Sequence, residues 1–194
     1  MLALLERNLE HMAHLAGDLL TYATLFDAAN SPRLVSLRVG ELVDELVSDF
    51  RPLAEAKGVR FSGEHDADVD LVTSDPTKLR QIASNLISNA LKYTESGRID
   101  LAVRSVNPQQ WAISVQDTGP GIAAEEREHL FDEYYRSGRT AHLEGNGLGL
   151  SIVKHLVDVL GGEIRLVSEL GRGSRFEVIL PRNDSSLSAS NSNN

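Results

Sequence analysis

Apolar residues in the first 27 positions recur at alternating steps of three and four residues, which is the spacing of a heptad seam. The positions in this series are Leu2, Leu5, Leu9, Met12, Ala16, Leu19, Ala23 and Phe26. Leu15, Leu20 and Tyr22 flank the seam and widen the apolar stripe beyond the width that a two-stranded coil buries. The pattern predicts a long helix over residues 1–28 in a four-helix bundle formed across a dimer. The alternative is an amphipathic helix docked on its own domain.

The helical pattern ends at Asn30-Ser-Pro32, and the rest of the chain alternates between helical and extended patterns. Gly58 is a helix stop, and Ser74-Asp75-Pro76 is a helix start with proline near the first turn. We expect helices at 39–57, 75–93, 124–136 and 148–160, and strands at 33–37, 59–62, 69–73, 99–103, 111–115, 164–167 and 176–180.

The order of these elements departs from a strict alternation of strand, helix and strand. Asn107-Pro108 separates two strands with alternating apolar and polar residues, which is typical of a half-buried hairpin. The order favours the α+β class, with a two-layer α/β sandwich in which helices 39–57, 75–93 and 148–160 cover one face of the sheet. The Ser- and Asn-rich tail 183–194 is predicted to be disordered.

Composition narrows the class of protein only slightly. The chain of 194 residues is 41% hydrophobic, which is enough for a real core, and it has no cysteine, which excludes disulfides and thiolate metal sites. A net charge of -9 makes nucleic acid a poor partner. Glu6 and Arg7 interrupt any signal-peptide pattern, and no apolar run approaches the roughly 18 residues of a membrane span.

Asn85 and Asn89 are candidates for cation binding, because residues four apart share one face of the predicted helix 75–93. Carboxamide oxygens suit a hard cation, and Lys92, three residues further on, could neutralise a phosphate. The alternative is that these asparagines are solvated or cap backbone groups. Asparagine is a mediocre helix former, so two of them inside a helix call for an explanation.

Asp117-Thr-Gly-Pro-Gly-Ile122 follows a predicted strand directly. A carboxylate at this point can accept a hydrogen bond from an amino group, such as that of a nucleobase, and the glycines would let a flat ring approach the backbone. The alternative is an ordinary turn at the end of a strand, since Asp-x-Gly is common in turns.

Two further segments could contribute to a binding site. Phe131-Asp-Glu-Tyr-Tyr-Arg136 could anchor a mobile flap and bring Arg136 or Arg139 to a phosphate, or it could be a helix with a flexible tail. Gly145-Asn-Gly-Leu-Gly149 leads into a predicted helix, where free N–H groups and the helix dipole favour an anion. This pattern is neither the dinucleotide fingerprint nor the P-loop, and alone it is a weak signal.

Taken together, the four segments resemble in order and spacing the N, G1, F and G2 boxes of sensor histidine kinases, within the wider group of Bergerat-fold ATPases. The resemblance extends from Leu34 to about Arg182 and includes the segments 74–82 and 171–181. Asp18-Leu-Leu-Thr-Tyr-Ala23 resembles part of the second helix of that family's dimerisation hairpin. The resemblance as a whole implies that residues 34–182 form an ATP-binding catalytic domain with the mixed sheet of the Bergerat fold.

The resemblance also implies a set of nucleotide-binding residues. Asp117 would bind the adenine amino group, and Asn89 with Asn85 would hold Mg2+ on the phosphates of ATP. Gly147 and its neighbours would let a flap hinge over the triphosphate. The implied set is Asn85, Asn89, Lys92, Tyr93, Asp117, Gly119, Gly121, Ile122, Phe131, Tyr135, Arg136, Gly145, Gly147, Leu148, Gly149, Leu150 and Ser174.

Two differences from relatives shape the expected activity. Hydrolysing members of the wider group carry a water-activating glutamate where this chain has Asn85, which favours phosphoryl transfer to a protein over ATP hydrolysis. The family's phospho-accepting histidine motif is missing, and His11 and His14 fall on the solvent side of the heptad pattern. We therefore expect a chain that binds ATP and Mg2+ without phosphorylating itself on histidine.

The resemblance implies a histidine protein kinase that donates the γ-phosphoryl to a histidine on a dimerisation domain, for relay to a response regulator receiver domain. The resemblance also implies a homodimer formed through residues 1–28 with the missing hairpin helix. It further implies a cytoplasmic location and no membrane contact. A nucleotide-binding sensor or scaffold without turnover is one alternative. A serine kinase of the anti-sigma type is another, although the dimerisation-type helix counts against it.

Overall fold

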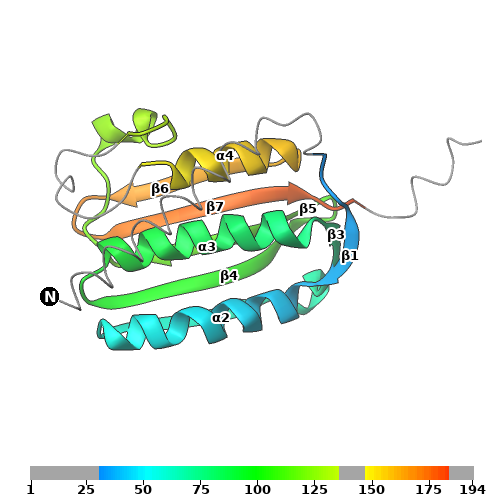
Figure 1. The fold of residues 1–194 in the computed structure, drawn as a ribbon, viewed down its shortest axis with the longest axis horizontal. Helices are drawn as coiled ribbons and strands as arrows, with labels where there is room; N and C mark the ends of the chain where they lie inside the picture. The colour runs from blue at the N-terminus through cyan, green and yellow to red at the C-terminus, as the bar shows by residue number, and fades with distance from the viewer. Residues whose placement is uncertain (1–30, 136–146, 184–194) are drawn as a thin grey trace, which may run out of the picture.

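The structure is a computed structural model, and it describes residues 31–135 and 147–183 (Figure 1). The predicted helix over 1–28 lies outside the described residues, as does almost all of the predicted tail. The elements in chain order are β1 (Val35–Arg38), α2 (Val39–Ala56), β2 (Val59–His65), η1 (Ala67–Val69), β3 (Leu71–Ser74), α3 (Pro76–Tyr93), β4 (Gly97–Asn107), β5 (Gln110–Asp117), η2 (Ala124–His129), α4 (Gly149–Val159), β6 (Glu163–Glu169) and β7 (Gly173–Pro181).

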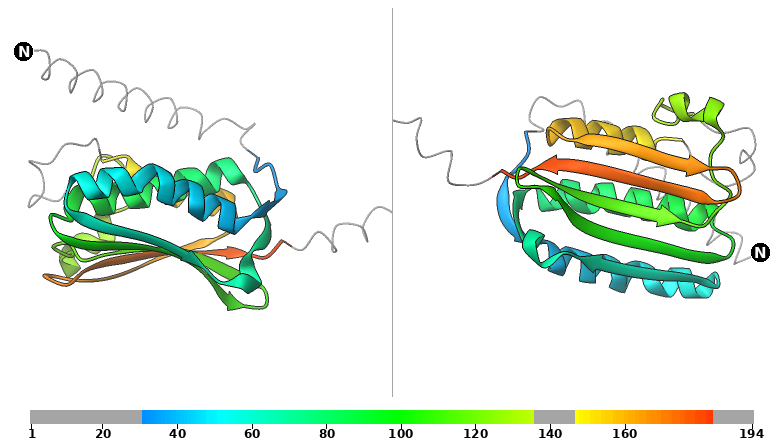
Figure 2. Two further views of the ribbon diagram at one scale, coloured as in Figure 1. Left: turned by 90° about the horizontal axis from the view of Figure 1, so that it is seen from below. Right: turned by 180° about the vertical axis from the view of Figure 1, so that it is seen from behind.

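The main sheet has five strands in the order β2-β4-β5-β7-β6. Only the β2–β4 pair is parallel, so the sheet is mixed, and β1 pairs with β3 in a separate antiparallel ribbon. Helices α2, α3 and α4 cover one face of the sheet, and the other face carries no helix among the described residues (Figure 2). The predicted α+β two-layer sandwich is confirmed, including the three helices that cover it.

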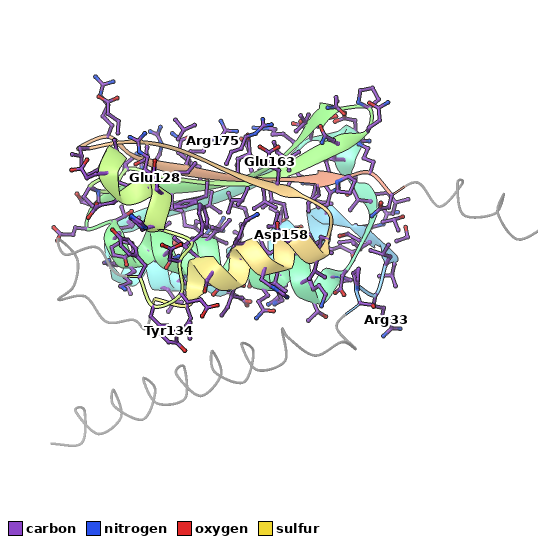
Figure 3. The ribbon with its side chains drawn as sticks, turned by 90° about the horizontal axis from the view of Figure 1, so that it is seen from above. Arg33, Glu128, Tyr134, Asp158, Glu163 and Arg175 are labelled. Carbon is purple, nitrogen blue, oxygen red and sulfur yellow. The ribbon has the colours of Figure 1, made fainter. Side chains whose placement is uncertain are left out.

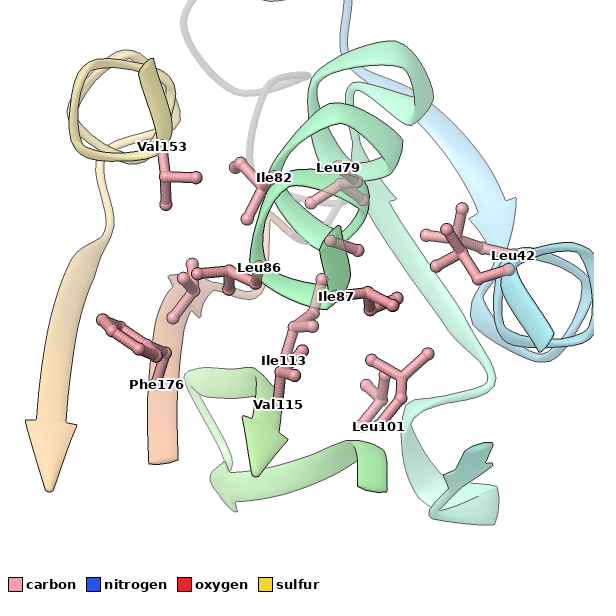
Figure 4. Packing of buried hydrophobic residues seen from close by; sticks show 14 of the residues in the cluster. Leu42, Leu79, Ile82, Leu86, Ile87, Leu101, Ile113, Val115, Val153 and Phe176 are labelled. Carbon is pink, nitrogen blue, oxygen red and sulfur yellow. The ribbon is translucent and has the colours of Figure 1, made fainter. Parts of the chain in front are cut away.

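The core lies between the sheet and the three helices, with α3 in the centre (Figure 4). Inward-facing strand residues such as Leu101, Ile113 and Phe176 meet Leu86 and Ile87 of α3. These positions alternate with outward-facing ones along each strand, as expected for a sheet that is covered on one side. The apolar alternation in the sequence therefore identified the covered face correctly.

Helix α3 begins where the sequence predicted. Asp75 is the N-cap residue, and its Oδ1 accepts hydrogen bonds from Thr77 N at 3.0 Å and Lys78 N at 3.1 Å. Its Oδ2 accepts from Arg33 N at 2.9 Å, which ties the start of the described chain to the helix. Pro76 occupies the first turn, where its missing N–H leaves no hydrogen bond unmade.

The predicted helix over 124–136 is wrong. The structure has a short 3-10 helix, η2, followed by turns, and Tyr134 adopts a left-handed φ of 61° that no α-helix accommodates. No residue of η2 is buried, so this segment lacks the packed apolar face that stabilises most helices in proteins. Smaller differences are that β2 runs on to His65 and that β3 begins only at Leu71, after η1.

The cap on α3 leads to a prediction about stability. Asp75→Ala removes the buried carboxylate that accepts from the N–H groups of Thr77 and Lys78, and it should cost about 1–2 kcal/mol of the free energy of unfolding. Asp75→Asn keeps an acceptor oxygen and should lose much less. Urea denaturation of both variants measures the difference, and equal losses would show that the charge or the hydrogen bond from Arg33 N matters rather than the cap.

Candidate functional site

A row of polar side chains ends the apolar face of the sheet. On the covered face, β5 runs Ile113, Val115, Asp117, and β6 runs through Leu166 to Ser168. Ser174 of β7 pairs with Ser168, and its N–H donates to Oδ1 of Asp117 at 3.3 Å. Asp117, Ser174 and Ser168 therefore form a continuous line across three neighbouring strands, which we call the polar row. All three are buried, with exposures of 8%, 7% and 8%.

Asp117 is the ionisable member of the polar row. Its Oδ1 accepts from Gly119 N at 2.8 Å and from Ser174 N. Burial raises the pKa of this carboxyl, and the two backbone N–H donors lower it again in part. Within the part of the chain that the structure describes, Oδ2 has no hydrogen-bond donor. The second oxygen is thus available to a donor on a bound molecule.

The glycine-rich loop after Asp117 is fastened to the β6–β7 hairpin. Ile122 N donates to Ser168 Oγ at 2.8 Å, and Gly171 N donates to Pro120 O at 2.8 Å. Gly121 has a left-handed φ of 68°, and a Cβ there would lie 2.0 Å from Glu169 O. The loop thus needs glycine at 121 for both its conformation and its close contact with β6.

The two asparagines of α3 lie beside the beginning of α4. Gly149 is the first residue of α4, and a Cβ built on it would lie 3.9 Å from Oδ1 of Asn85 and 3.9 Å from Oδ1 of Asn89. Both asparagines are half-buried. The side-chain oxygens of both asparagines therefore lie beside the N-terminal end of a helix, where free N–H groups favour an anion. A hard cation between carboxamides and phosphates suits such a set.

The last turn of α3 carries Lys92 and Tyr93, which are both half-buried. The ammonium of Lys92 lies 4.8 Å from the centre of the Tyr93 ring. Lys57, the C-cap of α2, donates to the carbonyls of Leu91 and Lys92. A cation at the C-terminal carbonyls of a helix is favourable, so Lys57 fixes the end of α3 and the two side chains that it carries.

The region around the predicted flap is described at its two ends only. Tyr134 lies near the N-terminal end of α4, far from Arg33 (Figure 3). Gly147 has a left-handed φ of 75°, and a Cβ there would lie 2.8 Å from Tyr135 O, so the two ends of the segment 136–146 meet. Arg136, Arg139 and Gly145 lie outside the described residues.

The predicted side chains next to this segment lie partly in the core. Phe131, Leu150 and Ile122 pack against the core cluster, and Leu148 belongs to it with 1% exposure. The Tyr135 ring stacks at an angle on His129, with 5.7 Å between ring centres. The proposed contacts of these residues with nucleotide remain predictions.

Sequence reasoning missed two residues of this region. Ser168 is a centre of hydrogen bonds, and Thr94 is fully buried with no hydrogen-bond partner for its Oγ1. A Cβ on Gly119 would lie 3.2 Å from that Oγ1, so Thr94 packs against the glycine-rich loop that follows Asp117. The signal for Ser168 was present, because it is the one polar residue in the inward series Ile164, Leu166, Ser168 of β6.

The described structure also has a groove away from these residues. It is an open groove of about 620 Å³ between β1, α2 and the first turns of α3, lined by residues such as Leu37, Glu41 and Pro76. The guanidinium of Arg80 at its edge already binds Glu45 and Asp49. Residues 76–80 are more than two helical turns from Asn89, and the lining of the groove includes no residue of the polar row.

The sequence from 74 to 184 matches the family of histidine kinase-, DNA gyrase B-, and HSP90-like ATPases. The chain belongs to this family. It is 34% identical over 177 residues to the adaptive-response sensory kinase SasA of Synechococcus sp. (strain JA-3-3Ab), which covers 91% of this chain and 47% of that protein. It is 33% identical to the sensor histidine kinase RppB of Synechocystis sp. (strain ATCC 27184 / PCC 6803 / Kazusa), covering 93% of this chain and 40% of that protein.

Solved structures agree with this assignment. Full-length ShkA in complex with AMPPNP superposes with a TM-score of 0.82 at 30% identity, over 92% of this chain and 37% of that one. The catalytic domain of histidine kinase ThkA gives a TM-score of 0.68 at 27% identity, over 77% of this chain and 98% of that one. The chain therefore contains an ATP-binding catalytic domain of the sensor histidine kinase type, and it spans less than half the length of SasA and RppB.

Two features are absent from the residues that the structure describes. No helix among them is long and apolar enough to cross a membrane. Residues 31–135 and 147–183 also contain no cluster of three or more His, Asp or Glu side chains placed to hold a metal ion.

The contact of Gly121 with β6 can be tested against a matched glycine. Gly171 has a similar left-handed φ of 77°, but nothing lies within 4 Å of a Cβ there. Either alanine costs about 1–2 kcal/mol for the left-handed backbone. Gly121→Ala must also displace Glu169 O, and it should therefore lower the urea midpoint clearly further than Gly171→Ala. Equal midpoints would contradict the close contact.

Asp117 should lower the stability of the free protein at neutral pH. Because its folded-state pKa is raised, the folded state holds this proton more tightly than the unfolded state, and stability falls as pH rises through the window above the ordinary carboxyl value of 3.8. Asp117→Asn keeps the acceptor for Gly119 N, and in thermal unfolding without nucleotide it should be more stable than the wild type at pH 7.

The extra stability of Asp117→Asn over the wild type should shrink as pH falls toward the ordinary carboxyl pKa. The wild-type carboxyl is then protonated, so it is uncharged like the asparagine. Asp100→Asn is the control, because this exposed carboxylate binds Arg98 and Ser62 and should gain nothing on neutralisation. A stability difference between Asp117→Asn and the wild type that does not change with pH would contradict the raised pKa.

Proposed function

We propose that the chain binds ATP with Mg2+ and donates the γ-phosphoryl group to a histidine on a dimerisation domain. In this reaction an imidazole nitrogen attacks the γ-phosphorus, the bond to the β-phosphate oxygen breaks, and ADP leaves. The phosphohistidine then donates its phosphoryl group to an aspartate of a response regulator. The observation that carries the proposal is the buried carboxylate of Asp117, with one oxygen left for a donor, in a chain of this ATPase family.

The adenine would lie at the polar row. Its amino group would donate to Oδ2 of Asp117, and Gly119 and Gly121 would let the ring approach the loop backbone. Asn85 and Asn89 would contribute oxygens to Mg2+ on the phosphates, and the beginning of α4 at Gly149 would face those phosphates. Lys92 and Tyr93 would contact phosphate or ribose. Positioning and neutralisation of charge supply most of what phosphoryl transfer requires.

The remaining parts of the proposal concern segments outside the described residues and the protein as a whole. Arg136 and Gly145 would belong to a flap over the triphosphate, and residues 1–28 would form a homodimer with a second hairpin helix. The catalytic domain would extend over 34–182 and work in the cytoplasm, where ATP is available. The identity of Asn85, where hydrolysing relatives have a glutamate, supports transfer to a protein over hydrolysis.

Calorimetric titration with a non-hydrolysable ATP analogue, with and without Mg2+, tests nucleotide binding. Asp117→Asn replaces an acceptor by a donor at the amino group and should weaken binding about 10-fold or more. Asn89→Ala should weaken binding mainly when Mg2+ is present. Ser88→Ala, on the exposed side of the same helix, is the control and should bind as the wild type does.

A second experiment separates the kinase from a nucleotide-binding scaffold. Full-length protein containing this chain is incubated with ATP labelled in the γ-phosphate, and an acid-labile, base-stable phosphate is the sign of phosphohistidine. The label should depend on Asn89. Binding of the analogue without any such label would favour the scaffold, and no saturable binding at all would overturn the nucleotide site.

A further inference from the structure

The hydroxyl group of Ser168 makes as many hydrogen bonds as a serine hydroxyl can. Its Oγ lies 2.8 Å from Ile122 N, 3.0 Å from Gly173 O and 2.9 Å from Ser174 Oγ. The side chain is 8% exposed, so water competes little for these contacts. A serine hydroxyl has one proton to donate and two lone pairs that accept, so these three contacts use its whole capacity.

The chemistry of the partners fixes the direction of each hydrogen bond. Ile122 N can only donate, and Gly173 O can only accept. The proton of Ser168 therefore points to Gly173 O, and one lone pair faces Ile122 N. The contact with Ser174 Oγ must then use the second lone pair, so Ser174 donates its own proton to Ser168.

This direction determines what Ser174 can offer to a bound molecule. Its proton is committed to Ser168, its N–H donates to Asp117 Oδ1, and only the lone pairs of its Oγ remain. The neighbouring Asp117 carboxylate also accepts hydrogen bonds. The Asp117 and Ser174 side chains therefore offer a ligand only acceptors, and they suit a group with several N–H donors. A carbonyl oxygen in the place of that group would face acceptors in a buried position. The selection acts on the 6-substituent, because the ring N1 accepts in a 6-aminopurine and carries a proton in a 6-oxopurine, so N1 has to point away from these two side chains.

We propose that Ser168 is a positioning residue for base selectivity: by taking the Ser174 proton, it makes this part of the site select a 6-aminopurine over a 6-oxopurine. The inference rests on the proposed ATP site and adds a residue that does not itself touch the nucleotide. The hydroxyl of Ser168 acts through Ser174 and also holds the glycine-rich loop at Ile122.

The test compares the affinities of Mg2+-bound ATP and inosine triphosphate, which replaces the 6-amino group by a 6-oxo group. Ser168→Ala frees the Ser174 proton, which can then rotate and donate to the 6-oxo group. The ratio of the two dissociation constants should shrink by about 3- to 10-fold, the equivalent of one hydrogen bond. Loosening of the loop alone would weaken both nucleotides in parallel and leave the ratio unchanged.

Ser114→Ala is the matched control. Ser114 is also buried on a central strand, but its hydroxyl makes one long contact of 3.4 Å to Ala102 O on the open side of the sheet. Its ratio should equal that of the wild type. If Ser168→Ala does not fold, as judged by circular dichroism, Ser174→Ala replaces it. This variant removes the acceptor directly and should weaken ATP while inosine triphosphate binds as well as before or more tightly.

Three results would overturn the inference. They are a wild type that binds both nucleotides equally, a Ser168→Ala ratio equal to that of the wild type, and a parallel loss for both nucleotides in whichever variant folds. In each of these cases ATP still binds to the wild type, so the proposed function survives. A wild type that binds neither nucleotide would overturn the proposed function, and this inference with it.

Discussion

The hydrogen bonds to Oδ1 of Asp117 hold the candidate site together. One comes from Gly119 N in the loop that follows β5, and the other comes from Ser174 N on β7. A single buried oxygen thus joins the end of a central strand, the glycine-rich loop and the neighbouring strand. Burial of a carboxylate is unfavourable unless donors compensate for the lost water, and the raised pKa shows that these two donors do so only in part. A ligand donor at Oδ2 would complete the compensation.

The rest of the fold places Oδ1 of Asp117 at the boundary between apolar and polar side chains. Apolar side chains fill the covered face of the sheet as far as Val115 and Phe176, and polar ones follow at the next inward-facing position of β5, β6 and β7. Helix α3 runs over this boundary, so its core residues pack on the apolar part while Asn85 and Asn89 face the beginning of α4. Stability and binding therefore use different stretches of the same strands and of the same helix.

Much of this arrangement could be predicted from the sequence. Alternation along the strands predicted the covered face, and Asp75-Pro76 placed the start of α3 correctly, because caps and periodicity are local properties. The helix predicted over 124–136 failed, since none of residues 124–129 is buried and Tyr134 takes a left-handed backbone. Ser168 and Thr94 were missed because their importance depends on neighbours distant in sequence, such as Ile122 and Gly119.

The central claim is that nucleotide binds at the polar row and not in the groove beside the first turns of α3. Amide chemical shifts of the ¹⁵N-labelled protein, followed during titration with a non-hydrolysable ATP analogue and Mg2+, test this most directly. The account predicts that the largest changes fall at Gly119, Ser174 and Gly149, with Thr77 and Arg80 almost unmoved. Changes concentrated at Leu37, Thr77 and Arg80 would place the nucleotide in the groove and contradict the account.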